Sequence, residues 1–173
     1  FRALIASTAL ALTALPALAG PEAEAVIEGA AKHIADPAKG RETLRQSMDL
    51  DTVANFTLGK YARRVSDTDR ARFAEAFETY LLESFEEQRD KFRDAEITVL
   101  GSKDRKPGDS IVETRVQRPG EAPQTVRLRV IEKNGEWRVV DVEVLGLWLA
   151  IEQRAQIAAI MDRLDKAEQA SGR

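Results

Sequence analysis

Residues 126–144 read VRLRVIEKNGEWRVVDVEV and carry the strongest structural signal in the chain. Apolar and charged residues alternate on each side of Asn134-Gly135, a pattern typical of two strands joined by a tight turn. Successive side chains of a strand point to opposite faces of its sheet. The stretch therefore predicts an antiparallel hairpin with valine and leucine on one face and charges on the other.

The strand register depends on how the hairpin turns. A two-residue turn at 134–135 would place Leu128 opposite Asp141 and bring a carboxylate onto the apolar face. We therefore expect a three-residue loop, 133–135, with a bulge at its glycine. This loop sets Leu128 opposite Val140, and it sets the preceding arginine, Arg127, directly across from Asp141.

Two further alternating runs, near 97–99 and 112–116, bring the predicted sheet to about four strands. A five-residue loop at 119–123 would set Val116 beside Val126 and Glu113 beside Arg129. The apolar face then comprises Val112, Val116, Val126, Leu128, Val130, Val140, Val142 and Val144. The opposite face comprises Glu113, Arg115, Arg127, Arg129, Asp141 and Glu143, so every carboxylate of the sheet points outward.

Helical periodicity dominates the rest of the chain, from about residue 21 to residue 92 and again from 148 to 170. Ser66 followed by Asp69 predicts the capped start of the longest helix. Its aromatic residues recur on one face, and at 1.5 Å per residue it is long enough to lie across the whole sheet. We therefore predict an α+β fold in which helices cover one face of the sheet.

Composition excludes several classes of function. The chain has 173 residues, about the size of one domain, and no cysteine. Without cysteine, the sequence offers no disulfide and no thiol nucleophile. His33 is its single histidine, so a His-rich metal site has no basis. The formal charge of −3 offers no cationic surface to a phosphate backbone, and we expect no nucleic-acid partner.

The first residues have the pattern of an export signal. Residues 1–15 are an almost unbroken apolar run, too short to cross a bilayer as a helix. Pro16 follows, and then Ala17-Leu18-Ala19 provides the small-x-small pattern of a cleavage site. We expect residues 1–19 to be a secretory signal peptide and residues 20–170 to be a single α+β domain.

Two blocks of sequence carry a family resemblance. Residues 57–85 read TLGKYARRVSDTDRARFAEAFETYLLESF, and residues 136–146 read EWRVVDVEVLG, with Arg154 and Gln156 following. In order and spacing these blocks resemble the MlaC family, the periplasmic phospholipid-binding component of the Mla lipid-transport system. The same family is also called the toluene-tolerance auxiliary component family of an ABC transporter.

The resemblance implies an NTF2-like α+β fold, with an antiparallel or mixed sheet covered on one face by helices and an apolar cavity between them. It implies a periplasmic carrier that shuttles phospholipid between the outer and inner membranes and helps to maintain outer-membrane lipid asymmetry. The implied partners are phospholipid, an inner-membrane ABC lipid transporter complex, an outer-membrane lipoprotein-porin complex and, transiently, a membrane surface. The implied carrier is not an enzyme and uses no metal or cofactor.

The sequence departs from the family pattern after Gly146. Leu147-Trp148 stands where the family commonly has a small Val-Ser pair, and Ile157 stands where an aromatic residue is usual. A branch of the family is linked to hopanoid metabolism, so a hopanoid-associated lipid carrier is an alternative. The indole of Trp148 fits either the cavity or ordinary core packing.

The residues expected to bind lipid are the apolar side chains of the long helix, the sheet and the start of the last helix. They are Phe56, Phe73, Phe77, Leu81, Phe85, Val112, Val116, Val126, Leu128, Val140, Val142, Val144, Leu147, Trp148 and Ile151. The residues alone leave open whether helices and sheet form a filled core or enclose a cavity. Two other functions therefore remain possible, an exported adaptor with a filled core and an NTF2-like enzyme with a carboxyl in its cavity.

Overall fold

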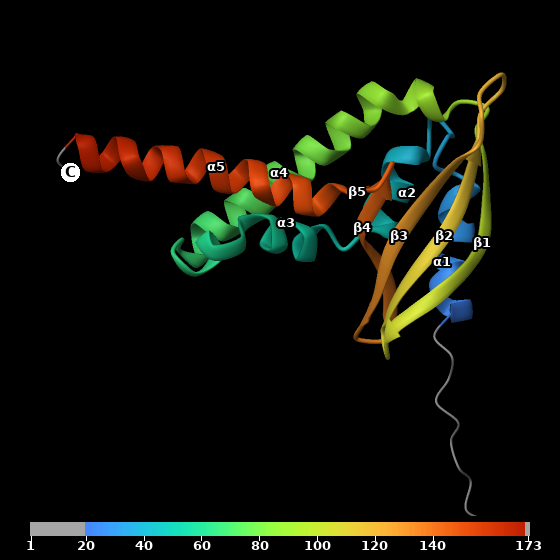
Figure 1. The fold of residues 1–173 in the computed structure, drawn as a ribbon, viewed down its shortest axis with the longest axis horizontal. Coiled ribbons are helices and arrows are strands. Elements are labelled where there is room, and N and C mark those ends of the chain that lie inside the picture. Colours follow the sequence, from blue (N-terminus) through green and yellow to red (C-terminus); the bar gives the residue numbers. More distant parts are fainter. Residues whose placement is uncertain (1–19, 172–173) are drawn as a thin grey trace, which may run out of the picture.

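The computed structural model describes residues 20–171, so the predicted signal at 1–19 lies outside the described residues. The chain forms a five-stranded antiparallel sheet in the order β1-β2-β3-β4-β5, together with helices (Figure 1). The helices are α1 (Gly20–Ala31), α2 (Gly40–Ser47), α3 (Leu50–Leu58), η1 (Gly59–Arg63), α4 (Asp67–Gln88), η2 (Arg89–Phe92) and α5 (Leu149–Ala170). The strands are β1 (Glu96–Lys106), β2 (Asp109–Gln117), β3 (Gln124–Lys133), β4 (Glu136–Val144) and β5 (Leu147–Trp148). The predicted α+β class is confirmed.

The helix that packs along the sheet is α1, and the expectation that the long helix beginning after Ser66 would lie across the sheet is wrong. Ala23 and Ile27 of α1 are buried against Val112 and Val130 of the sheet, since the small alanine lets the helix approach closely. Helix α4 contacts α2 and α3 instead and, with α3 and α5, projects away from the sheet (Figure 1).

The helix starts follow the predicted capping chemistry. Ser66 caps α4 by accepting a hydrogen bond from the Asp69 backbone N–H at 3.0 Å, as predicted. Asp49 caps α3 by accepting from the Thr52 N–H, also at 3.0 Å. Both caps satisfy backbone donors that a helix N-terminus leaves without intrahelical partners.

The β3–β4 register differs from the prediction. Asn134 and Gly135 both have positive φ and form a two-residue turn that pairs Lys133 with Glu136. A bulge at Val140, far from the turn, then shifts the register. As a result Leu128 lies opposite Val142, and the predicted pairs Leu128–Val140 and Arg127–Asp141 are wrong. The Asn-Gly pair favours the tight turn so strongly that the extra residue is accommodated within β4.

The β2–β3 register is also shifted, here by two residues. Val116 pairs with Gln124 rather than Val126, and Glu113 pairs with Arg127 rather than Arg129. The connection is longer than predicted and spans 118–123. Because a two-residue shift preserves the side-chain period, the apolar side chains still share one face.

A fifth strand follows a second tight turn, at Leu145-Gly146. Val144 pairs with Leu147, and both turn residues have positive φ, which is 53° for Leu145 and 83° for Gly146. Leucine is an unusual residue for this conformation, because its Cβ crowds the backbone there. The Leu145 side chain is also 78% exposed, so packing within the described chain does not offset the strain.

Replacing Leu145 with asparagine is expected to stabilise the protein. Asparagine tolerates positive φ far better, so L145N is expected to raise the free energy of unfolding by about 0.5–1 kcal/mol. Urea denaturation of the variant and the wild type measures the difference. A loss of stability would show that this turn is held by contacts of the leucine side chain.

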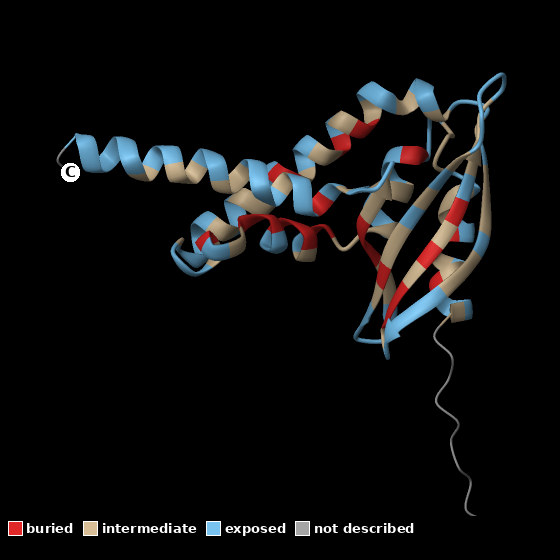
Figure 2. Cartoon of the chain, viewed as in Figure 1, coloured by how far each residue is buried: buried red, intermediate tan, exposed pale blue. Residues whose placement is uncertain are grey.

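The buried core is divided into two clusters. One lies under α1 and contains Val112, Val130 and Val139, and the other lies among α3, α4 and α5 and contains Phe77 and Val140. Figure 2 shows buried residues along α3 and the central strands, while most of the projecting part of α5 is exposed. Among residues 20–171, no helix combines the length and the apolar character needed to cross a bilayer.

Candidate ligand cavity

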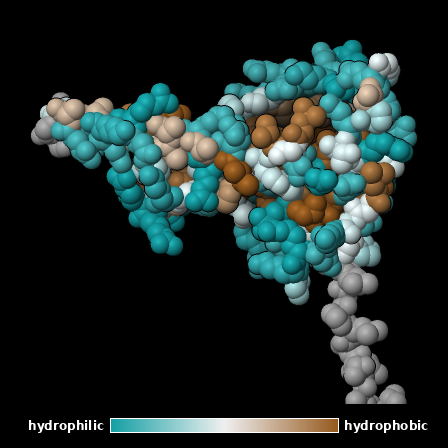
Figure 3. Space-filling model, in the orientation of Figure 1, coloured by the Kyte–Doolittle hydropathy of each residue, from teal (hydrophilic) through white to brown (hydrophobic). Residues whose placement is uncertain are grey.

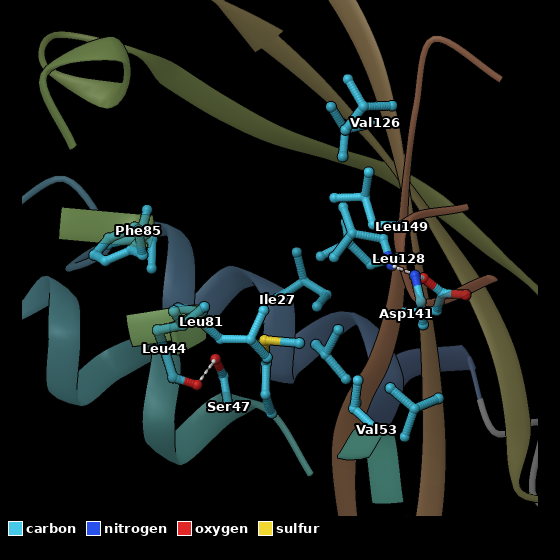
Figure 4. Close-up of a pocket in the computed structure, with 18 of the residues that line it drawn as sticks. Ile27, Leu44, Ser47, Val53, Leu81, Phe85, Val126, Leu128, Asp141 and Leu149 are labelled. Atoms are coloured by element: carbon cyan, nitrogen blue, oxygen red, sulfur yellow. Dashed lines mark hydrogen bonds between the residues drawn. The ribbon is translucent and has the colours of Figure 1, made fainter. Parts of the chain in front are cut away.

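A cavity of about 350 Å³ lies where the two core clusters meet, between the apolar face of the sheet and helices α1, α2 and α4 (Figure 4). The start of α5 contributes to its wall. Pockets that hold small-molecule ligands measure about 300–1,000 Å³, so this volume is sufficient for a ligand. Apolar side chains of the sheet and the α4 residues Phe77, Leu81 and Phe85 therefore border the same open space.

The lining is almost entirely aliphatic or aromatic. It comprises Ile27, Ala30, Ala31, Ile34, Leu44, Ser47, Met48, Val53, Phe77, Leu81, Phe85, Phe92, Ile97, Thr114, Val116, Val126, Leu128, Val139, Val140, Asp141, Val142, Val144, Leu149, Ala150 and Gln153. The Ser47 hydroxyl donates to the Leu44 carbonyl at 3.2 Å, and the Thr114 hydroxyl donates to the Val126 carbonyl at 2.9 Å. These hydroxyls are occupied by the backbone, so the wall they form favours an apolar ligand.

The bulge in β4 helps to form the cavity. Val139 and Val140 are adjacent in sequence, but Val139 belongs to the cluster under α1 and Val140 to the cluster with Phe77. Met48 packs against both clusters. The bulged strand therefore directs consecutive side chains to two packing centres, and the cavity lies between them.

Several of the predicted lipid-binding residues line this cavity. They are Phe77, Leu81 and Phe85 of α4 together with Val116, Val126, Leu128, Val140, Val142 and Val144 of the sheet. Leu128 and Val142 are half-buried although they face inward, which is expected for side chains that border an unfilled space. Figure 4 shows Phe85 and Leu81 on one side of this space and Val126 and Leu128 on the other.

The other predicted residues lie away from the lining. Val112 is fully buried beneath α1, and Phe73 stacks on Phe77 with ring centroids 5.7 Å apart. Phe56 lies on α3 with the Arg154 guanidinium 5.0 Å from its ring centroid. Leu147 and Ile151 are more than half exposed, and Trp148 is half-buried in β5.

The structure adds lining residues that the sequence prediction did not include. In α1 and the turn that follows it these are Ile27, Ala30 and Ile34, whose three- and four-residue spacing is a helical stripe visible in the sequence. Met48 and Val139 could not be inferred in the same way. Met48 reaches the cavity because it forms an isolated parallel bridge with Val139, at the point where the chain enters α3.

Asp141 is the one carboxylate of the described lining, and it serves to anchor α5. One carboxylate oxygen, Oδ1, accepts hydrogen bonds from the backbone N–H groups of Val142 and Ala150, each at 2.8 Å. Burial raises the pKa of Asp141, opposed by these two hydrogen bonds and by the charge of Arg129. In Figure 4 the carboxyl points away from Ile27 and the α4 side chains, so it is placed to cap a helix.

The opposite face of the sheet carries the predicted charges, paired differently. Arg127 Nε contacts Glu113 Oε2 at 3.1 Å, and its Nη1 contacts Glu143 Oε1 at 3.0 Å. Arg129 makes two hydrogen bonds to the buried carboxylate of Asp109, at 3.0 and 2.9 Å. Burial acts to raise the pKa of Asp109, but Arg129, Arg105 and Lys106 together hold it below its ordinary value.

This lowered pKa predicts a pH-dependent contribution to stability. An acid with a depressed folded-state pKa stabilises the fold above its unfolded pKa, near 3.8, and loses that effect as the pH falls through the folded value. D109N is therefore expected to lower the free energy of unfolding by about 1–2 kcal/mol at neutral pH. Urea denaturation of both proteins from pH 7 to pH 3 should show the gap narrowing. A gap that is constant over this range would contradict the ion-pair assignment.

The fold and the cavity together define an α+β protein with an apolar, ligand-sized space between its sheet and its helices. Residues 28–169 match the MlaC protein family, and the chain belongs to that family. A solved structure from Ralstonia solanacearum, described as a phospholipid-binding protein in complex with a phospholipid, is similar with a TM-score of 0.73 and 17% identity. The similarity covers 83% of this chain and 89% of that chain and shows a shared fold. No curated protein sequence matched this chain.

Proposed function

We propose that this protein binds the acyl chains of a phospholipid in its cavity and carries the lipid between membranes. The observation that carries the proposal is the apolar cavity of about 350 Å³, lined by apolar side chains from both the sheet and the helices. Membership of the MlaC family supports the proposal, as does the shared fold with a protein described in complex with a phospholipid.

Transfer of the lipid requires only an apolar environment for its acyl chains. Each methylene moved out of water gains about 0.8 kcal/mol, but a lipid that leaves a bilayer starts in hydrocarbon. A cavity lined by valine, leucine and phenylalanine replaces that environment, so the exchange between carrier and membrane is close to balanced. The direction of transport is then set by the partners rather than by the carrier.

The proposed setting follows from the family. We propose that the protein acts in the periplasm, after removal of residues 1–19, and exchanges lipid with an inner-membrane ABC transporter complex and an outer-membrane lipoprotein-porin complex. Its role would be to help to maintain outer-membrane lipid asymmetry and, through it, tolerance to toluene. Binding alone accounts for this role, without catalysis, metal or cofactor.

Extraction of the protein purified from cells tests the proposal. Organic extraction followed by mass spectrometry should recover about one phospholipid per protein. A hopanoid in place of phospholipid would assign the alternative lipid, and an extract without lipid would favour the exported adaptor. Turnover of a small carbonyl compound would instead require an enzyme.

A further inference from the structure

A run of exposed apolar residues borders the cavity. Residues 145–151 read LGLWLAI and contain no charged side chain. Leu145 is 78% exposed, Leu147 60%, Leu149 46% and Ile151 55%. These four side chains, here called the 145–151 patch, lie at the β4–β5 turn and at the start of α5. Figure 3 shows apolar surface near the place where α5 leaves the sheet.

The patch is maintained at a cost to the fold. Leu145 occupies the first position of a tight turn in a left-handed conformation, which asparagine or glycine would adopt with less strain. Its side chain nonetheless extends into solvent. A strained and exposed leucine indicates a role outside the stability of the folded chain, because function is a common reason for a stability cost.

The patch is continuous with the cavity. Leu149 belongs to both, since it lines the cavity and is nearly half exposed. Val144, which pairs with Leu147 across the turn, also lines the cavity, as does Gln153 one turn further along α5. Leu149 therefore links the exposed patch to the cavity wall.

We propose that the 145–151 patch inserts into the surface of a phospholipid bilayer and holds the side of the cavity lined by Leu149 against it. The inference rests on the proposed function, because it gives a lipid chain a path that avoids water. An uncharged segment with four exposed aliphatic side chains suits the interface of a bilayer.

Trp148, adjacent in sequence to Leu147 and Leu149, supplies a reporter beside the patch. The other indole, Trp137, packs against the core cluster under α1. The variant W137F leaves Trp148 as the single tryptophan. With phosphatidylcholine vesicles, its emission is expected to shift to shorter wavelength and to be quenched by lipids brominated near the head group. The shift should persist at high salt, because the contact is apolar.

Asparagine substitutions test the assignment. L145N and L147N are each expected to weaken flotation of the protein with phosphatidylcholine vesicles about fivefold. The matched control is L100N, which removes a leucine that is 50% exposed on β1, and it should float as the wild type does. Wild-type protein that neither floats nor shifts in emission overturns the proposal, and so does an equal loss in L100N.

Filling the cavity from detergent micelles separates this proposal from the carrier function. L145N and L147N should take up phospholipid from micelles to the wild-type level, because their side chains are not part of the lining. Uptake from vesicles should fall in both variants. If the wild type takes up no phospholipid from micelles, the carrier function fails while the vesicle result stands; normal uptake from vesicles by L145N and L147N overturns the bilayer contact.

Discussion

Replacing Leu128 with tryptophan is expected to lower phospholipid binding at least about tenfold while the protein stays folded. Leu128 lies in the central part of β3, opposite Val142, and both side chains border the cavity. An indole at this position would occupy space that the acyl chains need. In a filled core the same change would cost about 1–3 kcal/mol through overpacking, whereas an open cavity admits the larger ring.

The control is the same substitution on the other face of the same strand. Thr125 is exposed and lies opposite Arg115 on β2, away from the cavity. T125W should bind phospholipid as the wild type does, measured by native mass spectrometry after uptake from micelles. If L128W unfolds with a large loss of stability, or binds lipid normally, the space beside Leu128 is not the binding site.

Replacing Asp141 with alanine is expected to cost about 2–4 kcal/mol of unfolding free energy. The change removes the acceptor of two backbone N–H groups and leaves the start of α5 without its cap. D141N keeps an acceptor oxygen and avoids the burial of a charge, so it should stay within about 1 kcal/mol of the wild type. Urea denaturation at neutral pH measures both differences.

The pH dependence gives a second test of the Asp141 assignment. Because burial raises the folded-state pKa of this carboxyl, its contribution to the unfolding free energy increases as the pH falls through that pKa toward the ordinary value near 3.8. D141N should remove this increase. The control E143A alters a neighbouring carboxylate whose partner is the half-exposed Arg127, and it should cost less than about 1 kcal/mol. Equal losses in D141A and E143A would contradict the helix-capping role.

The alternating valines allowed the sequence to predict the sheet and its apolar face, and helical periodicity predicted the helices that flank it. The pairing partners were beyond prediction, because period-two patterns are unchanged when a strand shifts by two residues. The bulge at Val140 was hidden for a related reason, since Val139 and Val140 are both valine and either one suits the apolar face. The period-two pattern therefore identifies the apolar face of the sheet correctly but does not determine which residues pair across the strands.

The cavity was predicted in part, because periodicity identifies inward-facing side chains but contains no information about the gap between layers. Phe77, Leu81 and Phe85 were placed on the correct face of α4, yet α1 takes the position on the sheet. Helix α1 rather than α4 packs on the sheet because the small side chain of Ala23 allows closer packing than a row of phenylalanines does. Resemblance to the MlaC family provided the expectation of a cavity, and the family match confirms that resemblance.

The position of a bound acyl chain tests the account most directly. Protein with ¹³C-labelled methyl groups, filled with unlabelled phospholipid, allows isotope-filtered NOE contacts between protein methyls and lipid methylenes to be measured. Cross-peaks from the methyls of Val126, Leu128 and Val142 to chain methylenes are predicted, because these side chains line the cavity. Cross-peaks confined to exposed leucines, with none from these three residues, would place the lipid on the surface and contradict the account.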